Sequence, residues 1–334
     1  MVTKASLATM QVGRAARLLR LWSRLGLLVV NLLFLAAFTI SAPAFLDDYN
    51  LFTLLRFVSI QIVVGFSQMV MFSAGEMNLS VGAIGAVVAL FAGGLMQVAG
   101  VPPVVAIAAA FGLALLAGAI NGFLVIRSGI NSFIITLATS SMFSGVMLIT
   151  TKAKAYDALP ASFVQFGKMR LFELPISPLV PVMIVIGAFF FFLYRNTSFG
   201  REILAVGANR RAAGMSGVPV ARVIMAVHML SAASAGIAGI MMASMLGSAV
   251  PVIGQDWLLP SCAAPAIGGT LLSGGIVSVF GAIMGGLLIA GITNGLLLLN
   301  VSNFWLNLFL GLVLLVAVVL DRIRILQASR QVGD

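Results

Sequence analysis

Long runs of apolar residues alternate with short polar stretches along most of the chain, between residues 25 and 320. A membrane core of about 30 Å takes roughly 20 helical residues to cross, and most of the runs are about that long. The pattern therefore predicts an all-α, polytopic membrane protein with about ten transmembrane segments. They are expected at residues 25–44, 52–73, 80–99, 103–126, 132–151, 178–194, 219–246, 258–272, 276–298 and 303–320.

One of these segments, at residues 258–272, is shorter than the others and carries Pro260 and Pro265. Proline has no backbone N–H and disrupts the interior of a helix. Irregular backbone is tolerated in a membrane only where protein or water covers it. We therefore expect at least one short or broken helix, which either crosses the membrane or re-enters it here.

Basic residues lie between the apolar runs and predict the orientation of the chain. With ten crossings, Arg127, the cluster at residues 195–222 and the tail fall on the same side as the N-terminus. Because cytoplasmic loops carry an excess of Lys and Arg, both termini are expected in the cytoplasm. The loop at residues 152–177 is the exception, since it is assigned outside but holds Lys152 and Lys168.

Three parts of the chain follow from this topology. Residues 1–24 are a basic cytoplasmic segment, residues 25–320 form a single membrane domain, and residues 321–334 are a cytoplasmic tail.

The composition agrees with a membrane location, because 61% hydrophobic and 8% charged residues leave no surface for a soluble protein. The net charge of +10 would suggest nucleic acid as the partner of a soluble protein. Here the bases lie between apolar runs, where they orient the chain and attract anionic lipid headgroups. We therefore expect membrane lipid, and no nucleic acid, as a partner.

Residues for catalysis are scarce. The glycine-rich stretch at residues 268–275 has no lysine, so it is not a phosphate loop, and the chain is not expected to hydrolyse ATP. His228 and Cys262 are the only His and Cys, too few for a metal site or a nucleophilic dyad. The sequence thus predicts a protein that is not an enzyme and binds no metal or other cofactor of its own.

Glu76 is the one acid that could lie within the membrane, in a polar break at residues 73–78. Intramembrane acids often mark ion or proton pathways, although Glu76 could equally lie in a cytoplasmic turn. A proton-coupled secondary carrier, the alternative function, usually needs more such acids.

Small residues alternate with positive charge at residues 207–217, inside a long basic loop. This stretch could be a short surface helix that begins near Asn209, ends at Gly214 or Gly217, and presents its small residues to another protein. The alternative is an ordinary positively charged loop.

Two G-x-x-x-G pairs near the C-terminus predict close contacts between helices, because glycine lets helix backbones approach in lipid. The partner helix could belong to the same subunit or to a second subunit. The four residues are Gly281, Gly285, Gly291 and Gly295.

Residues 205–217 fit the pattern Ala-x-Gly-x-Asn-x-x-Ala-Ala-x-x-Ser-Gly, which resembles a signature of ribose-type sugar ABC importer permeases. The similarity covers roughly residues 50–321. Four further blocks resemble the family in the same order, at residues 78–82, 121–139, 268–275 and 294–296.

The resemblance implies a permease domain in the bacterial inner membrane that pairs with a second permease subunit, in a homodimer or a heterodimer. It also implies two cytoplasmic ATPase subunits, which use ATP, and a periplasmic solute-binding protein. Residues 207–217 would be the coupling helix that sits in a groove of the ATPase. The coupling residues would be Gly207, Asn209, Arg210, Arg211, Ala212, Ala213, Ser216 and Gly217.

Several positions depart from the family pattern. Asn78 replaces the usual Asp, Arg210 stands where an acid is common, and residues 257–265 lack the usual acids. Because of these departures, the resemblance does not indicate which particular sugar this chain transports.

The predicted spans supply amides and hydroxyls and almost no charge, which favours a small neutral polar solute such as a monosaccharide or polyol. Any of these polar side chains could instead hydrogen-bond a neighbouring helix. The candidate pathway residues are Asn78, Ser80, Asn121, Thr136, Thr139, Ser140 and Asn294, with Gln61 and Gln68 also considered.

Overall fold

A computed structural model describes residues 26–172, 174–302, 304–312, 315–316 and 319. The predicted basic segment at residues 1–24 and the tail at residues 321–334 lie outside this range. The described part is helical and contains no strand beyond a single bridge between Tyr156 and Ala249. The elements are a first helix at Gly26–Ser41, η1 Pro43–Leu46, α2 Asp48–Ser73, α3 Val81–Gln97, α4 Pro103–Ser128, α5 Ser132–Thr151, α6 Ala161–Lys168, α7 Leu179–Asn196, α8 Ser198–Ala208, α9 Arg210–Met215, α10 Val220–Leu246, α11 Leu258–Ile267 and α12 Val279–Leu298.

Six of these helices are long and apolar enough to cross a membrane, namely α2, α4, α5, α7, α10 and α12. The first helix, α3 and α11 are apolar but shorter. The all-α, multi-pass prediction is therefore confirmed, whereas the number of ten crossings stays a prediction. The last predicted segment is helical at residues 304–312 and lies partly outside the described residues.

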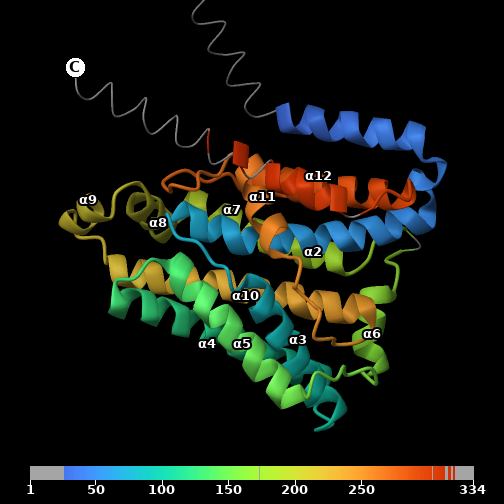
Figure 1. The fold of residues 1–334 in the computed structure, drawn as a ribbon, viewed down its shortest axis with the longest axis horizontal. Coiled ribbons are helices and arrows are strands. Elements are labelled where there is room, and N and C mark those ends of the chain that lie inside the picture. Colours follow the sequence, from blue (N-terminus) through green and yellow to red (C-terminus); the bar gives the residue numbers. More distant parts are fainter. Residues whose placement is uncertain (1–25, 173, 303, 313–314, 317–318, 320–334) are drawn as a thin grey trace, which may run out of the picture.

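α2 and α10 form the centre of the helix bundle. In the most apolar 18-residue stretch of each helix, 83% of α2 and 67% of α10 is buried, against 28% of α4, 22% of α7 and 17% of α5. Figure 1 shows α4 and α5 along one edge of the molecule and the first helix and α12 along the opposite edge. The exposed apolar side chains of the outer helices suit contact with lipid.

α11 is the short helix that the sequence predicted. It has ten residues and contains Pro265, and the chain before it, at residues 247–257, is not helical. α11 packs closely between α2 and α12: a Cβ added to Gly65 would lie 3.1 Å from the Ala264 side chain, and one added to Gly285 would lie 2.1 Å from the Ala264 carbonyl oxygen. Protein therefore covers the interrupted backbone of this segment.

The glycines of α12 lie mostly against their own chain. A Cβ on Gly281 would lie 1.8 Å from the carbonyl oxygen of Gly268, and one on Gly295 would lie 2.4 Å from the ring of Phe38 in the first helix. Gly285 contacts α11. A Cβ added to Gly291 would have no other atom within 4 Å. Three of the four predicted packing glycines thus serve contacts within the subunit.

Two helices have no counterpart among the predicted elements, α6 and α8. α6 lies in the loop at residues 152–177 and packs on α10, where the Ser244 hydroxyl donates a hydrogen bond to the Phe163 carbonyl at 2.7 Å. α8 buries Ile203 and Val206 and leads into α9. α9 lies at one extremity of the molecule and α6 at the opposite one (Figure 1).

Candidate functional site

The short helix expected within residues 207–217 is present as α9. The Asn209 side chain caps its N-terminus by accepting a hydrogen bond from the Ala212 N–H at 3.0 Å. After Met215 the chain turns at Gly217, whose φ of +84° is a conformation that favours glycine. Arg211 and Ala212 are exposed. α9 therefore presents a small-residue surface with positive charge at the end of the molecule.

Backbone contacts anchor α8 and α9 to the bundle. A Cβ on Gly207 would lie 2.1 Å from the Ser73 carbonyl oxygen and 2.7 Å from the Gly275 nitrogen. The Gly275 N–H donates a hydrogen bond to the Ser73 carbonyl at 3.1 Å. Three segments therefore meet without intervening side chains: the end of α2, the end of α8 and the turn after α11.

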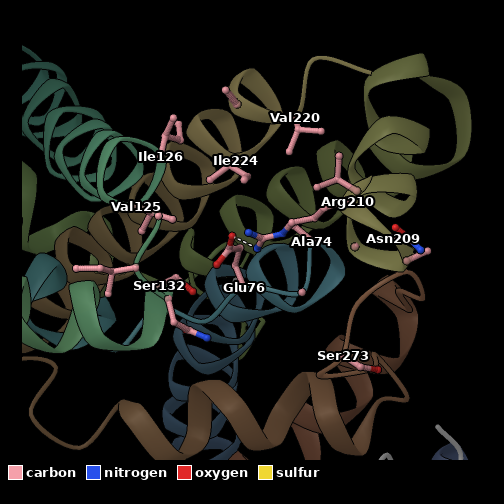
Figure 2. Close-up of a pocket in the computed structure, with 18 residues that line it drawn as sticks. Ala74, Glu76, Val125, Ile126, Ser132, Asn209, Arg210, Val220, Ile224 and Ser273 are labelled. Atoms are coloured by element: carbon pink, nitrogen blue, oxygen red, sulfur yellow. Dashed lines mark hydrogen bonds and ion pairs between the residues drawn. The ribbon is translucent and has the colours of Figure 1, made fainter. Parts of the chain in front are cut away.

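An ion pair links α9 to the connection between α2 and α3. The guanidinium of Arg210, the first residue of α9, contacts the carboxylate of Glu76 (Figure 2). The Glu76 side chain is 3% exposed and that of Arg210 is 47% exposed. Glu76 is therefore buried, and its ion pair holds the start of α9 against the α2–α3 connection.

A cavity of about 740 Å³ lies beside this ion pair (Figure 2). Its wall combines the α2–α3 connection, the adjoining ends of α4 and α5, the α8–α9 junction and the start of α10. Ile126 and Ser132 come from the α4–α5 side, and Val220 and Ile224 come from α10. The cavity therefore lies where the α8–α9 junction meets the ends of α4 and α5.

The polar break after Glu76 continues into a buried hydrogen-bond network. Asn78 Oδ1 accepts hydrogen bonds from the Ser80 N–H at 2.9 Å and the Ser80 hydroxyl at 2.6 Å, and its Nδ2 donates to Ser231 Oγ at 2.9 Å. Asn121 Nδ2 donates to Ser80 Oγ at 2.9 Å, and the Ser67 hydroxyl donates to the Ser231 carbonyl at 2.9 Å. All five residues are 0% exposed. This network joins α2, α3, α4 and α10.

α5 supports the same connection through its hydroxyl groups. Ser132 Oγ accepts a hydrogen bond from the Met77 N–H at 3.0 Å, and Thr136 Oγ1 accepts one from the Leu79 N–H at 2.9 Å. These bonds satisfy backbone donors that the break between α2 and α3 leaves without helical partners.

The candidate pathway residues therefore fall into two places. Asn78, Ser80, Asn121 and Thr136 gather around residues 77–80, and Thr139 and the half-buried Ser140 continue along α5. Asn294 lies apart on α12, where it exchanges two hydrogen bonds of 3.0 Å with Asn50. In this conformation most of these groups hold helices together.

Ser67, Ser231 and Asn50 complete these contacts but were not among the predicted site residues. A single Ser or Asn in an apolar helix carries little signal in the sequence, because its partner comes from a distant helix. His228 and Cys262 are both buried. In the described part of the chain no three His, Cys, Asp or Glu residues lie together as a metal site would require.

Comparison with known proteins identifies the family. The model for "Branched-chain amino acid transport system / permease component" matches residues 50–318. No solved structure matches this chain.

Curated relatives match along most of their length. The ribose import permease protein of Bacillus subtilis is 35% identical over 84% of this chain and 87% of its own. The D-allose transport system permease protein of Escherichia coli is 32% identical over 90% of this chain and 92% of its own. The L-arabinose ABC transporter permease protein of Azospirillum brasilense is 33% identical over 91% of this chain and 89% of its own. With a family match and relatives of this extent, the chain belongs to the permease components of the branched-chain transport family.

Proposed function

We propose that this chain is the permease subunit of a bacterial ABC importer for a monosaccharide or a closely related neutral polyol. The observation that carries the proposal is the similarity, over 84% or more of the chain, to permeases named for ribose, D-allose and L-arabinose. Each of these solutes is uncharged and rich in hydroxyl groups. A second permease copy completes the path, a periplasmic binding protein delivers the solute, and separate ATPase subunits supply the energy.

The proposed orientation puts the α9 end of the molecule in the cytoplasm, together with both chain termini. Arg201, Arg210, Arg211 and Arg222 lie at or near α8 and α9. An excess of basic residues at the cytoplasmic surface supports this orientation. The opposite end, which carries α6, then faces the periplasm and the binding protein.

The secondary carrier is the weaker alternative. Among the residues that the structure describes, Glu76 is the one acidic residue that is buried, and it forms an ion pair with Arg210. A proton-coupled carrier usually places several acids along its path, whereas Glu76 lies in an ion pair at the α9 end of the molecule.

The test of this function is solute uptake by vesicles that contain the permease, its ATPase and its binding protein. We expect ATP-dependent uptake of at least one of D-ribose, D-allose and L-arabinose, and none of sugar phosphates or amino acids. Uptake driven by an ion gradient without ATP would favour the carrier, and import of a branched-chain amino acid would refute the sugar assignment.

α9 is the proposed coupling helix, and Ala212 is the position that tests it. Ala212 is exposed, so Ala212→Trp leaves the fold intact but obstructs a groove that fits small residues. We expect uptake to fall about tenfold or more while the complex keeps its ATPase activity, because the bulky side chain prevents α9 from seating in the groove. A loss of about 1.4 kcal/mol in this interaction lowers the ratio of uptake to ATP hydrolysis tenfold.

Ala109→Trp is the matched control, since Ala109 is also exposed but lies on α4, an outer helix whose exposed apolar surface suits lipid. Gly217 is a poorer test position, because any side chain at its positive φ is strained. Unchanged uptake in Ala212→Trp would remove α9 from the coupling mechanism.

A further inference from the structure

A second cavity, of about 490 Å³, lies far from α9. Its wall comes from the first half of α2, the last turns of α10, the loop at residues 250–257, the end of α12 and the stretch at 304–312. Because α2 ends and α10 begins at the α9 end of the bundle, this cavity lies toward the other end. The residues that carry its chemistry are Phe57, Gln61, Asp256, Trp257, Thr293 and Asn307.

Gln61 is the central polar group of this wall. It is 5% exposed, and its amide has no hydrogen-bond partner among the described residues. The amide atoms of Gln61 are not among the fully buried polar atoms that lack a partner, so they face the open space of the cavity. Their free N–H and C=O groups suit a ligand that can both donate and accept hydrogen bonds, as a hydroxyl group does.

Two aromatic side chains, Phe57 and Trp257, line the same cavity. Trp257 is 6% exposed, and its ring is fixed by Gly85, where an added Cβ would lie 2.5 Å from the ring. The indole N–H has no partner among the residues that the structure describes. A ring with one free polar edge suits a ligand that has both apolar C–H faces and hydroxyl groups.

The charges of the lining exclude several classes of solute. Asp256 is exposed and contributes one carboxylate, and no Lys, Arg or His lines the described wall. A carboxylate accepts hydrogen bonds from hydroxyl groups but repels phosphates and carboxylates. The volume falls within the range of roughly 300–1,000 Å³ that is typical of small-molecule sites.

We propose that this cavity is a binding site inside the permease for a neutral polyol of monosaccharide size. Gln61 and Asp256 hold its hydroxyl groups by hydrogen bonds, and Trp257 contacts its C–H face and donates its indole N–H. This inference rests on the proposed function and adds the location of the site and the residues that recognise the solute.

Thiol protection tests occupancy of the cavity independently of transport. In a reconstituted complex that carries Cys262→Ala, a cysteine introduced by Gln61→Cys reacts with a small neutral thiol reagent. We expect saturating D-ribose, D-allose or L-arabinose to slow the reaction severalfold, and ribose 5-phosphate to leave it unchanged. Gln255→Cys is the control, because Gln255 is exposed in the same loop but does not line the cavity.

Uptake by Gln61→Leu tests the contribution of the amide itself. Leu keeps a similar volume without hydrogen-bonding groups, so we expect uptake to fall about tenfold, with the binding protein's affinity and the thermal stability of the permease unchanged. Gln255→Leu should transport like the unmodified complex.

The two proposals fail in different ways. An unmodified complex that imports one of the sugars, combined with normal uptake by Gln61→Leu and no thiol protection, would overturn the site and leave the function standing. An unmodified complex that imports no monosaccharide would overturn the function itself.

Discussion

Asn78 and Gln61 are both buried side-chain amides of the same membrane domain, in regions with opposite polar surroundings. Asn78 uses its oxygen and its nitrogen in three hydrogen bonds to Ser80 and Ser231. Gln61 has no such bond among the described residues and lines a cavity instead. Their difference shows that burial alone does not identify a pathway residue. The distinguishing property is whether other parts of the protein already satisfy the polar group.

The two regions also differ in how the backbone is arranged. Around Asn78, hydroxyl groups of α5 satisfy the N–H groups of Met77 and Leu79. Around Gln61, the adjacent segment at residues 247–257 forms turns that leave space beside α2. The polar groups of the first region are satisfied within the protein, whereas those of the second region face a cavity.

The largest expected effect on stability comes from Asn78→Ala, which removes three buried hydrogen bonds. At about 1 kcal/mol for each bond, we expect a loss of about 3 kcal/mol in the free energy of unfolding. Chemical denaturation of the purified permease in detergent measures this loss. Gln61→Leu is the matched comparison. Its free energy of unfolding should not fall, because the substitution removes no hydrogen bond within the protein. Equal losses in the two variants would abolish the distinction between the regions.

A smaller effect is expected from the ion pair between Glu76 and Arg210, and it should be asymmetric. Arg210→Ala leaves a buried carboxylate without its partner and should cost about 2 kcal/mol, after allowance for the half-exposed arginine. Glu76→Gln leaves Arg210 in contact with water and should cost less than about 1 kcal/mol.

The double variant Glu76→Gln with Arg210→Ala separates the pair from other effects. It should recover most of the stability that Arg210→Ala loses, and denaturation of all three variants gives the coupling free energy. Losses of the same size in the two single variants would show that the carboxylate is not buried as described.

The smallest effect is expected at Asn294, which exchanges two hydrogen bonds with Asn50. Asn294 is 9% exposed and Asn50 more so, and Asn294→Ala should therefore cost about 1 kcal/mol. Uptake should stay normal, which would show that the Asn294 amide, like that of Asn78, stabilises the fold and does not contact the solute. Loss of uptake at unchanged stability would move Asn294 to the pathway instead.

Much of the fold could be predicted because its signals are local. Apolar runs gave the positions of the long helices, Pro265 marked the short α11, and Asn209 marked the start of α9. α6 was missed, because eight residues in a mixed polar loop carry no distinct signal.

The site was predicted less well, because its contacts join distant parts of the chain. Nothing local distinguishes Gln61 from Asn78, since their surroundings come from other helices. Likewise, Glu76 and Arg210 are 134 positions apart, so their pairing depends on how α2 and α8 pack.

The backbone contact among Ser73, Gly207 and Gly275 also bears on the order in which the protein assembles. Each of these residues belongs to a different third of the bundle's sequence, so the three-way contact can form only after the last of the three has been synthesised. Ser73 and Gly207 can meet early, but the Gly275 N–H reaches them only after α11 has left the ribosome. We therefore expect a nascent chain that stops before α11 to hold α9 loosely, so that the ATPase subunits can be recruited only by a nearly completed permease.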